Sequence, residues 1–284
     1  MLFCPGDRPD RFDKAYAAAD MVILDLEDGV APGQKDVART AIRESSLDPA
    51  RTIVRVNSAR HPDFREDRLA IEAAGYEMVM LAMAESASDM EGLDGLAIIA
   101  LCETPQGILG AETIAAHPGV VGLMWGAEDL TASLGGASSR NRSRRYTDVV
   151  RYSRSRVLLA AAAAGKRAID GVYLTIDDAP GLAEETEDAV RSGFAAKSCI
   201  HPGQVQVVRQ CFAPTSEELL WARRVTEAGA RQHGVFALAN EMVDEPLLKQ
   251  ARRLLERANS VMERGQGDPV DEAEIQCRSR DLPQ

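Results

Sequence analysis

Short apolar runs recur along the chain, and polar, helix-like sequence follows each of them. Runs that are apolar at consecutive positions are typical of parallel strands buried on both faces, because helices cover both sides of such a sheet. The pattern predicts eight strands, at Leu2–Cys4, Met21–Leu24, Thr52–Val56, Glu77–Leu81, Ala97–Leu101, Val120–Met124, Arg167–Ile169 and Ala196–Ile200.

The alternation of strand and helix predicts an α/β fold with a parallel sheet. Eight repeats in roughly 200 residues favour closure into a (β/α)8 TIM barrel, which we expect to span residues 1–213. An open doubly wound sheet is the alternative. It is disfavoured because no predicted strand is followed by the G-x-G-x-x-G turn of a dinucleotide-binding fold.

A C-terminal helical extension is predicted at residues 214–264. Helical patterns cover 216–233 and 246–264, with an extended segment at Val235–Val243 between them. The helices are amphipathic, so their apolar faces need a cover, and a neighbouring barrel in an oligomer would supply one. Residues 265–284 form a polar tail without apolar periodicity.

Acidic residues follow two of the predicted neighbouring strands. Glu103 comes after Ala97–Leu101, and Glu128 and Asp129 come after Val120–Met124, just beyond Gly126, which we expect to let the backbone turn sharply. Parallel strands end at one edge of a sheet, so these carboxylates should converge. Two carboxylates, with the remaining ligands supplied by water and substrate, are typical of a Mg²⁺ site.

Acids after strands are also ordinary first-turn residues of helices, where they meet free backbone N–H groups and the helix dipole. We prefer that interpretation for Glu128. For Glu103, capping of the next helix by Thr104 would leave the glutamate free to point inward.

Polar residues follow most of the other predicted strands as well, which places them at the end of a barrel where active sites lie. A polar mouth of this kind favours an ionic ligand, although single members could be caps, and His201 is expected to be a structural hydrogen-bonding residue. The set comprises Asp7, Arg8, Asp25, Glu27, Asp28, Arg55, Asn57, Glu85, Asp170 and His201.

Composition narrows the class of protein. The 284 residues are 45% hydrophobic and 27% charged, as in globular proteins, with no long apolar run and no signal-peptide pattern, so we expect a cytoplasmic protein. The net charge of −11 argues against broad binding to nucleic acid or to anionic membranes. Five cysteines without metal-site spacing are expected to be reduced thiols.

Several short motifs, of four to eight residues each, occur in an order that is specific in combination. The chain thereby resembles the citrate lyase beta subunit and its stand-alone relatives, CoA-ester lyases of the malyl-CoA lyase type in the HpcH/HpaI aldolase superfamily, over about residues 1–250. The motifs are CPGDRP (Cys4–Pro9), ILDLEDGV (Ile23–Val30), VRVN (Val54–Asn57), CETPQG (Cys102–Gly107), WGAEDL (Trp125–Leu130), IDGVY (Ile169–Tyr173), CIHPGQ (Cys199–Gln204) and MVDEP (Met242–Pro246).

The resemblance implies Mg²⁺-dependent cleavage of a 3-hydroxyacyl-CoA thioester, of the citryl-, malyl- or citramalyl-CoA type, into a 2-oxo acid (oxaloacetate, glyoxylate or pyruvate) and an acyl-CoA such as acetyl-CoA. It implies metal ligation by Glu103 and Asp129, and substrate binding by Arg55, Glu103 and Arg8. It also implies catalytic roles for Arg55, Glu103 and Asp244, with Asp244 supplied to a neighbouring subunit of a homotrimer.

One departure from the family pattern is Met83, where relatives commonly have a lysine. Met83 favours one alternative function, a weakly active subunit that works only within a larger citrate lyase complex. A second alternative, a metal-dependent aldolase acting on free hydroxy-oxo acids, stays open because related barrels use the same metal and arginine without CoA. A further hypothesis concerns seven arginines between Arg140 and Arg156. They are either a solvated surface or, in part, a site for the phosphates of CoA.

Overall fold

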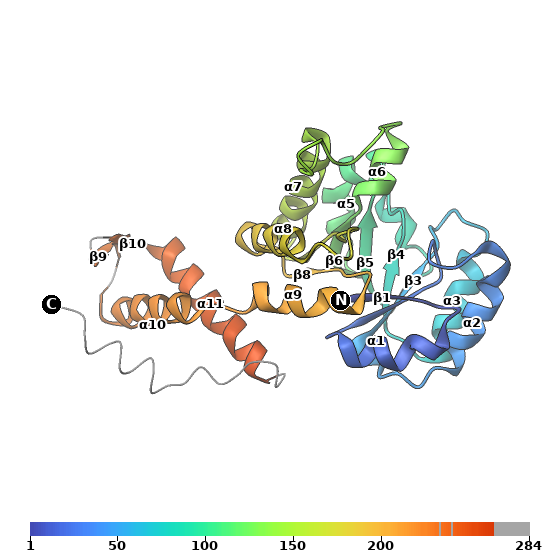
Figure 1. Ribbon diagram of the computed structural model, residues 1–284, viewed down its shortest axis with the longest axis horizontal. Coiled ribbons are helices and arrows are strands. Elements are labelled where there is room, and N and C mark those ends of the chain that lie inside the picture. The colour runs from blue at the N-terminus through green and yellow to red at the C-terminus, as the bar shows by residue number, and fades with distance from the viewer. Residues whose placement is uncertain (233, 240, 264–284) are drawn as a thin grey trace. The chain divides into compact units, whose positions relative to one another are not determined.

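Eight strands form one parallel sheet in chain order (Figure 1). The computed structural model describes residues 1–232, 234–239 and 241–263. The strands are β1 (Leu2–Pro5), β2 (Val22–Asp25), β3 (Thr52–Val56), β4 (Met78–Leu81), β5 (Ala97–Cys102), β6 (Val120–Trp125), β7 (Arg167–Asp170) and β8 (Ala196–Lys197).

The sheet closes on itself between its last and first strands. The Cys199 amide donates a hydrogen bond to Met1 O, and the Phe3 amide donates one to Cys199 O. Both bonds are 2.9 Å long, and together they form a parallel bridge. The predicted TIM barrel is therefore confirmed, and the open-sheet alternative is wrong. The eighth strand is shorter than predicted because Ser198 still pairs with β7 whereas Cys199 already pairs with β1.

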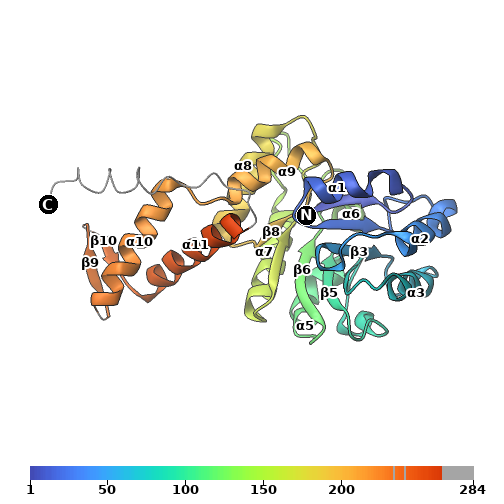
Figure 2. The same cartoon turned by 90° about the horizontal axis from the view of Figure 1, so that it is seen from below.

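Helices lie outside the strands, with α2 and α3 on one side and α7 and α8 on another (Figures 1 and 2). The helices of the barrel are α1 (Phe12–Ala18), α2 (Lys35–Glu44), α3 (Phe64–Ala74), α4 (Pro105–Leu109), α5 (Ala111–Ala115), α6 (Ala127–Ser133), α7 (Asp148–Ala163), α8 (Ala179–Ser192) and α9 (Pro202–Phe212), with 3-10 turns at Pro9–Arg11, Pro32–Gln34, Pro49–Arg51 and Ala87–Met90.

Inward-facing apolar side chains fill the barrel, because successive residues of a strand point alternately to its two faces. The interior is therefore a packed core that forms the floor of the site, and not a channel. Its buried members are Ile23, Ile53, Met80, Ile99, Leu101, Met124 and Ile169.

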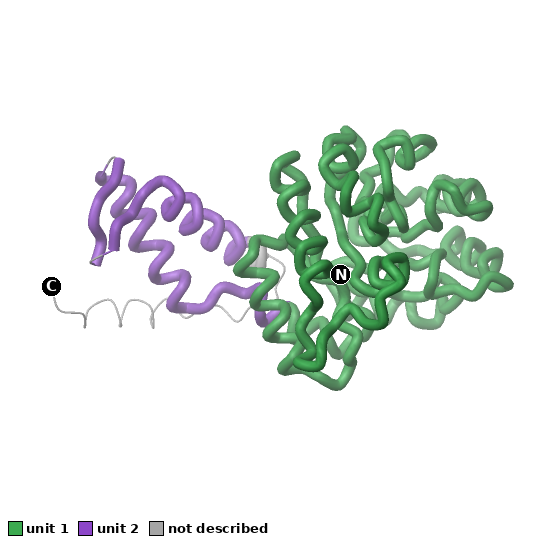
Figure 3. Tube along the Cα trace, turned by 90° about the horizontal axis from the view of Figure 1, so that it is seen from above, with its two compact units in different colours: residues 1–208 green, residues 209–284 purple. Residues whose placement is uncertain are grey.

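A second compact unit begins at Arg209, inside α9 and close to the predicted boundary at residue 213 (Figure 3). It contains α10 (Ser216–Arg231), β9 (Phe236–Leu238), β10 (Glu241–Val243) and α11 (Glu245–Glu263). The predicted extended segment folds back as an antiparallel β9–β10 pair. Its core includes Ala222, Val225 and Leu248. The predicted polar tail at 265–284 lies outside the described residues.

Four of the five cysteines, Cys4, Cys102, Cys199 and Cys211, lie in the described part of the chain and form no disulfide there, and Cys277 lies outside it. Among the described residues, no helix has both the length and the apolar character needed to cross a bilayer.

Candidate active site

Arg55, Glu103 and Asp129 line one pocket of about 360 Å³ at the carboxyl ends of the barrel strands. Parallel strands bring these residues together although they lie far apart in sequence. Among the described residues that line this pocket, Arg55 is the one cation. The remaining wall is acidic (Asp25, Asp28 and Glu128) on one part and largely apolar (Phe3, Leu101, Met124, Trp125, Tyr146, Val172 and Ile200) on the other.

Glu103 follows β5 and points inward, as the sequence predicted. Thr104 caps α4 by accepting a hydrogen bond from the Gly107 amide at 3.0 Å. Glu103 is only 3% exposed, and its Oε1 accepts a hydrogen bond from the Met83 amide at 3.0 Å. Met83 has a φ of +49°, the left-handed region that a side chain of this size rarely occupies. This backbone conformation at the end of β4 accompanies the donation of the Met83 amide to Glu103.

Gly126 gives Glu103 its space. A Cβ atom at Gly126 would lie 2.7 Å from Glu103 Oε2 and 2.9 Å from Glu103 Cβ. The Gly126 backbone is extended, with φ −123° and ψ 129°, which any residue can adopt. The expectation of a sharp turn was therefore wrong: glycine is needed here for the approach of a carboxylate, not for backbone freedom.

The electrostatics of Glu103 and Asp129 fit a divalent cation. Burial and the nearby Asp129 raise the pKa of Glu103 well above its ordinary value. Burial and Asp28 raise the pKa of Asp129, whereas its interaction with the Glu103 side chain lowers that pKa. A buried carboxylate and a half-buried one that lie side by side repel each other unless a proton or a cation lies between them. Within the described residues, no cluster of three or more metal-ligating side chains is found.

Arg55, at the end of β3, is held by two acids. It donates to Asp25 through Nε (2.7 Å to Oδ1) and Nη2 (2.6 Å to Oδ2), and its Nη1 lies 2.9 Å from Glu27 Oε2. A guanidinium has five N–H groups, so groups on both terminal nitrogens stay available for a second carboxylate. Burial alone would lower the pKa of Arg55, but Asp25 and Glu27 raise it above its ordinary value. Burial raises the pKa of Glu27 to about 7.

Asp25 holds Arg55 in place, a contact that was not predicted from the sequence, where Asp25 was only one of the polar residues expected at the barrel mouth. Its two oxygens also accept hydrogen bonds from the Glu27 and Gly29 amides, which fix the loop after β2. The signal in the sequence was that Asp25 and Arg55 both lie at the carboxyl ends of predicted neighbouring strands, and the structure adds that they are directly in register.

Among the other candidate residues, Glu128 lines the pocket, whereas Arg8 and Asp244 do not. Glu128 is in the first turn of α6, as preferred, and accepts a hydrogen bond from Ser139 Oγ at 2.6 Å. Arg8 forms an ion pair with Asp10 and is not among the residues that line the pocket. Asp244 belongs to the second unit, where its Oδ1 accepts from the Leu247 amide at 3.2 Å at the start of α11. The roles of Arg8 and Asp244 toward substrate stay predictions.

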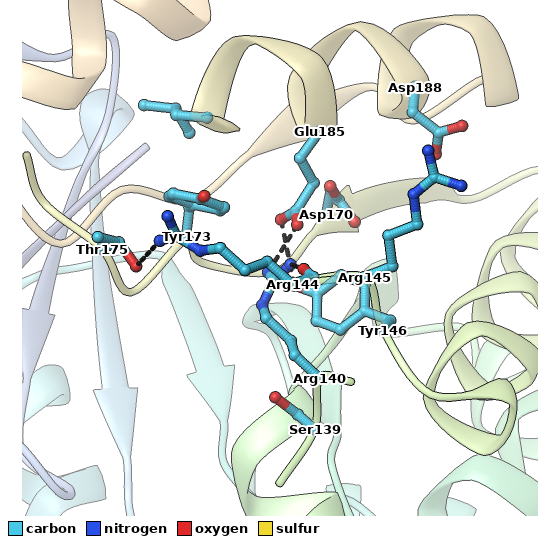
Figure 4. A network of polar contacts seen from close by, with 12 residues as sticks. Ser139, Arg140, Arg144, Arg145, Tyr146, Asp170, Tyr173, Thr175, Glu185 and Asp188 are labelled. Atoms are coloured by element: carbon cyan, nitrogen blue, oxygen red, sulfur yellow. Dashed lines mark hydrogen bonds and ion pairs between the residues drawn. The ribbon is translucent and has the colours of Figure 1, made fainter. Parts of the chain in front are cut away.

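The arginine-rich stretch lines a second pocket of about 810 Å³, and Tyr146 lines both pockets (Figure 4). Most of its arginines already have acidic partners: Arg140 pairs with Glu185, Arg144 with Asp178, Arg151 with Asp148, Arg154 with Asp170 and Asp188, and Arg156 with Glu112. Within the described residues no side-chain partner is found for Arg145.

Comparison with known proteins agrees with this geometry. Residues 1–202 match the family model described as HpcH/HpaI aldolase/citrate lyase. A citrate lyase subunit beta-like protein of Mycobacterium tuberculosis is 51% identical, covering 92% of this chain and 95% of that protein. A (3S)-malyl-CoA thioesterase of Cereibacter sphaeroides is 33% identical, covering 92% and 94%.

The crystal structure of protein CitE from M. tuberculosis in complex with magnesium, acetoacetate and coenzyme A superposes with a TM-score of 0.87. It is 51% identical and covers 91% of this chain and 97% of that chain. Magnesium in that homologue agrees with the cofactor expected from the two converging carboxylates. The chain therefore belongs to the HpcH/HpaI aldolase/citrate lyase family of carbon–carbon lyases.

Proposed function

We propose that this protein cleaves a 3-hydroxyacyl-CoA thioester into a 2-oxo acid and an acyl-CoA, with Mg²⁺ as cofactor. The observation that carries the proposal is the meeting of Arg55, Glu103 and Asp129 in one pocket. An arginine beside a pair of carboxylates can take a 2-oxo acid at two points. The guanidinium binds the carboxylate of the oxo acid, and the two acids hold the cation that the oxo acid chelates.

The contacts of these residues support the roles that we propose for them. Asp25 and Glu27 orient Arg55, whose remaining N–H groups bind the carboxylate of the oxo acid. Glu103 and Asp129 would hold the cation. The Met83 amide orients Glu103 by donating a hydrogen bond to it, and the absence of a side chain at Gly126 leaves room for its carboxylate. When bound, Mg²⁺ supplies Lewis-acid stabilisation of negative charge on the hydroxyl oxygen.

Cleavage breaks the bond between the hydroxyl-bearing carbon and the α-carbon of the acyl group. The hydroxyl group loses its proton and becomes the carbonyl of the oxo acid, and the electron pair of the broken bond goes to the acyl α-carbon, which is then protonated. We assign that proton to Asp244 of a neighbouring subunit, in a homotrimer. The resemblance to the family supports this assignment, and the trimer and the cytoplasmic location also stay predictions.

Purified protein should be assayed with Mg²⁺ on citryl-, malyl- and citramalyl-CoA, with the products identified by mass spectrometry. We expect an oxo acid and acetyl-CoA from at least one thioester. Free CoA and a hydroxy acid would instead show a thioesterase, and cleavage of free hydroxy-oxo acids without CoA would show an aldolase.

No product from any of these substrates would contradict the proposal for the protein acting alone. Product formation only after other citrate lyase subunits are added would then support the subunit function. Met83, in place of the lysine of relatives, is the feature that favours testing this alternative.

A further inference from the structure

Two aromatic side chains form one wall of the site pocket, and both are tethered by their polar atoms. Trp125, at the end of β6, donates from Nε1 to Asp170 Oδ1 at 2.9 Å. Tyr146 donates from its hydroxyl to Glu185 Oε1 at 3.1 Å, and Figure 4 shows Glu185 pointing toward Tyr146 and Arg140. The two rings meet edge to face, with centroids 5.3 Å apart.

Lys197 connects the two carboxylates that hold these rings. Its Nζ donates to Asp170 Oδ2 at 2.8 Å, to Glu185 Oε1 at 3.0 Å and to Gly171 O at 2.9 Å. All three N–H groups of the ammonium are therefore used. The side chain of Lys197 is fully buried, and Asp170 lies in register with it on the neighbouring strand.

The remaining partners of the two carboxylates are arginines. Arg154 donates from Nε to Asp170 Oδ1 at 2.8 Å, and Arg140 donates from Nη2 to Glu185 Oε2 at 2.6 Å. The guanidinium of Arg140 also lies 3.8 Å from the centroid of the Tyr146 ring. Tyr146 is thus held between a cation and Trp125, on the boundary between the site pocket and the arginine-lined pocket.

From these contacts we infer that Lys197 is a positioning residue: by bridging Asp170 and Glu185 it fixes Trp125 and Tyr146 as the rigid wall against which the oxo acid packs. Lys197 does not line the pocket, so it acts through the two rings. The buried ion pairs by themselves are weak grounds for a stability role, because the desolvation of buried charges offsets their attraction. The inference rests on the proposed use of this pocket for a 2-oxo acid.

The test measures ligand affinity separately from folding. Variants Tyr146→Phe, Glu185→Gln and Lys197→Met are titrated by calorimetry, in saturating Mg²⁺, with whichever of pyruvate, glyoxylate and oxaloacetate the unaltered protein binds most tightly. Tyr76→Phe is the matched control, because Tyr76 is a buried tyrosine that lies just before β4, at the opposite end of the strands from the site.

Each of the three variants should bind the oxo acid about tenfold more weakly, the scale of one charge-assisted hydrogen bond, and Tyr76→Phe should bind it normally. The double variant Lys197→Met/Tyr146→Phe should bind the oxo acid no more weakly than whichever single variant binds it more weakly. The reason is that both changes disrupt the same tether, the one through Glu185. In a Trp221→Phe background, Trp125 is the sole tryptophan, and its emission should move to longer wavelength in Lys197→Met.

Unchanged affinity in the variants, together with a lowered melting temperature, would assign Lys197 a purely structural role and overturn the inference. If Lys197→Met does not fold, Tyr146→Phe and Glu185→Gln decide by the same criterion. Failure of the unaltered protein to bind any of the three oxo acids would instead contradict the proposed function on which the inference rests.

Discussion

Asp25 holds Arg55 in a two-point fork, with Nε 2.7 Å from one carboxylate oxygen and Nη2 2.6 Å from the other. The two residues end adjacent strands in direct register, so the backbone fixes their spacing before the side chains meet. The fork removes rotational freedom from the arginine and presents its remaining N–H groups to the pocket. Preorganisation of this kind saves the cost of ordering the side chain when the ligand binds.

Replacing Arg55 by lysine should weaken binding of the oxo acid by about 1.5–3 kcal/mol, because an ammonium cannot give two parallel hydrogen bonds. Asp25→Asn should also weaken binding of the oxo acid. The loss of binding free energy in the double variant should be smaller than the sum of the two single losses, because both residues serve one interaction. Calorimetric titration checks this, with the exposed Arg43→Lys as control. Unaltered affinity in Arg55→Lys would place the carboxylate of the oxo acid elsewhere.

Glu103→Gln and Asp129→Asn should abolish the rise in melting temperature that Mg²⁺ produces. The raised pKa values of both groups mean that the folded, metal-free protein binds more protons than the unfolded chain. Stability without metal should therefore fall as the pH rises from about 4 through the raised pKa values, and Mg²⁺ should reverse the fall.

Melting temperatures between pH 5 and 8, with Mg²⁺ and with a chelator, test this expectation. In the chelator, both variants should be more stable than the unaltered protein at neutral pH, since each removes one of two carboxylates that repel each other. An equal response to Mg²⁺ in the variants and the unaltered protein would mean that other residues hold the metal.

Gly126→Ala should lower Mg²⁺ affinity by about 10–100-fold, the effect of disturbing a residue that orients a ligand. The added methyl group would displace Glu103, whereas the strand should tolerate it because the backbone is extended. Gly33→Ala is a matched control, since nothing lies within 4 Å of a Cβ at that position. The titration is done by calorimetry, and normal metal affinity in Gly126→Ala would show that Glu103 is not a ligand.

Asp244 can be tested for its two possible roles separately. Asp244→Asn keeps an oxygen for the Leu247 amide and so preserves the start of α11, but it cannot transfer a proton. We expect it to be folded and inactive. Mixing dissociated Glu103→Ala and Asp244→Asn subunits should restore part of the activity if sites are shared between subunits. Hybrid oligomers without activity would contradict a shared site, and full activity of Asp244→Asn would leave only the capping role.

If Arg144 and Arg145 contact the phosphates of CoA, the double variant Arg144→Ala/Arg145→Ala should bind CoA more weakly and with a smaller dependence on salt. Arg144 is exposed and only partly paired, and Arg145 is exposed, so their loss should not disturb the fold. The double variant Arg43→Ala/Arg191→Ala, at two other exposed arginines, is a control of equal charge. Equal salt dependence of CoA affinity in all three proteins would identify the arginine surface as a solvated one.

The sequence alone determined the barrel and the identity of its central acids. Consecutive apolar residues mark strands buried on both faces, and the alternation of strand and helix leaves few architectures, so seven of the eight predicted strands agree closely with β1–β7. Glu103 and Asp129 were identifiable because parallel strands end at one edge, a rule that needs no knowledge of side-chain packing.

Only the tertiary structure decided which side chains contact one another across strands. The fork between Asp25 and Arg55, the donation from the Met83 amide to Glu103 and the bridge formed by Lys197 depend on register and on backbone angles, which apolar periodicity does not encode. Gly126 shows the difference. Its lack of a side chain leaves room for Glu103, which comes from the end of the neighbouring strand, whereas the sequence shows only that a glycine is present. Local pattern fixes the elements, whereas the site depends on distances between residues that are remote in the chain.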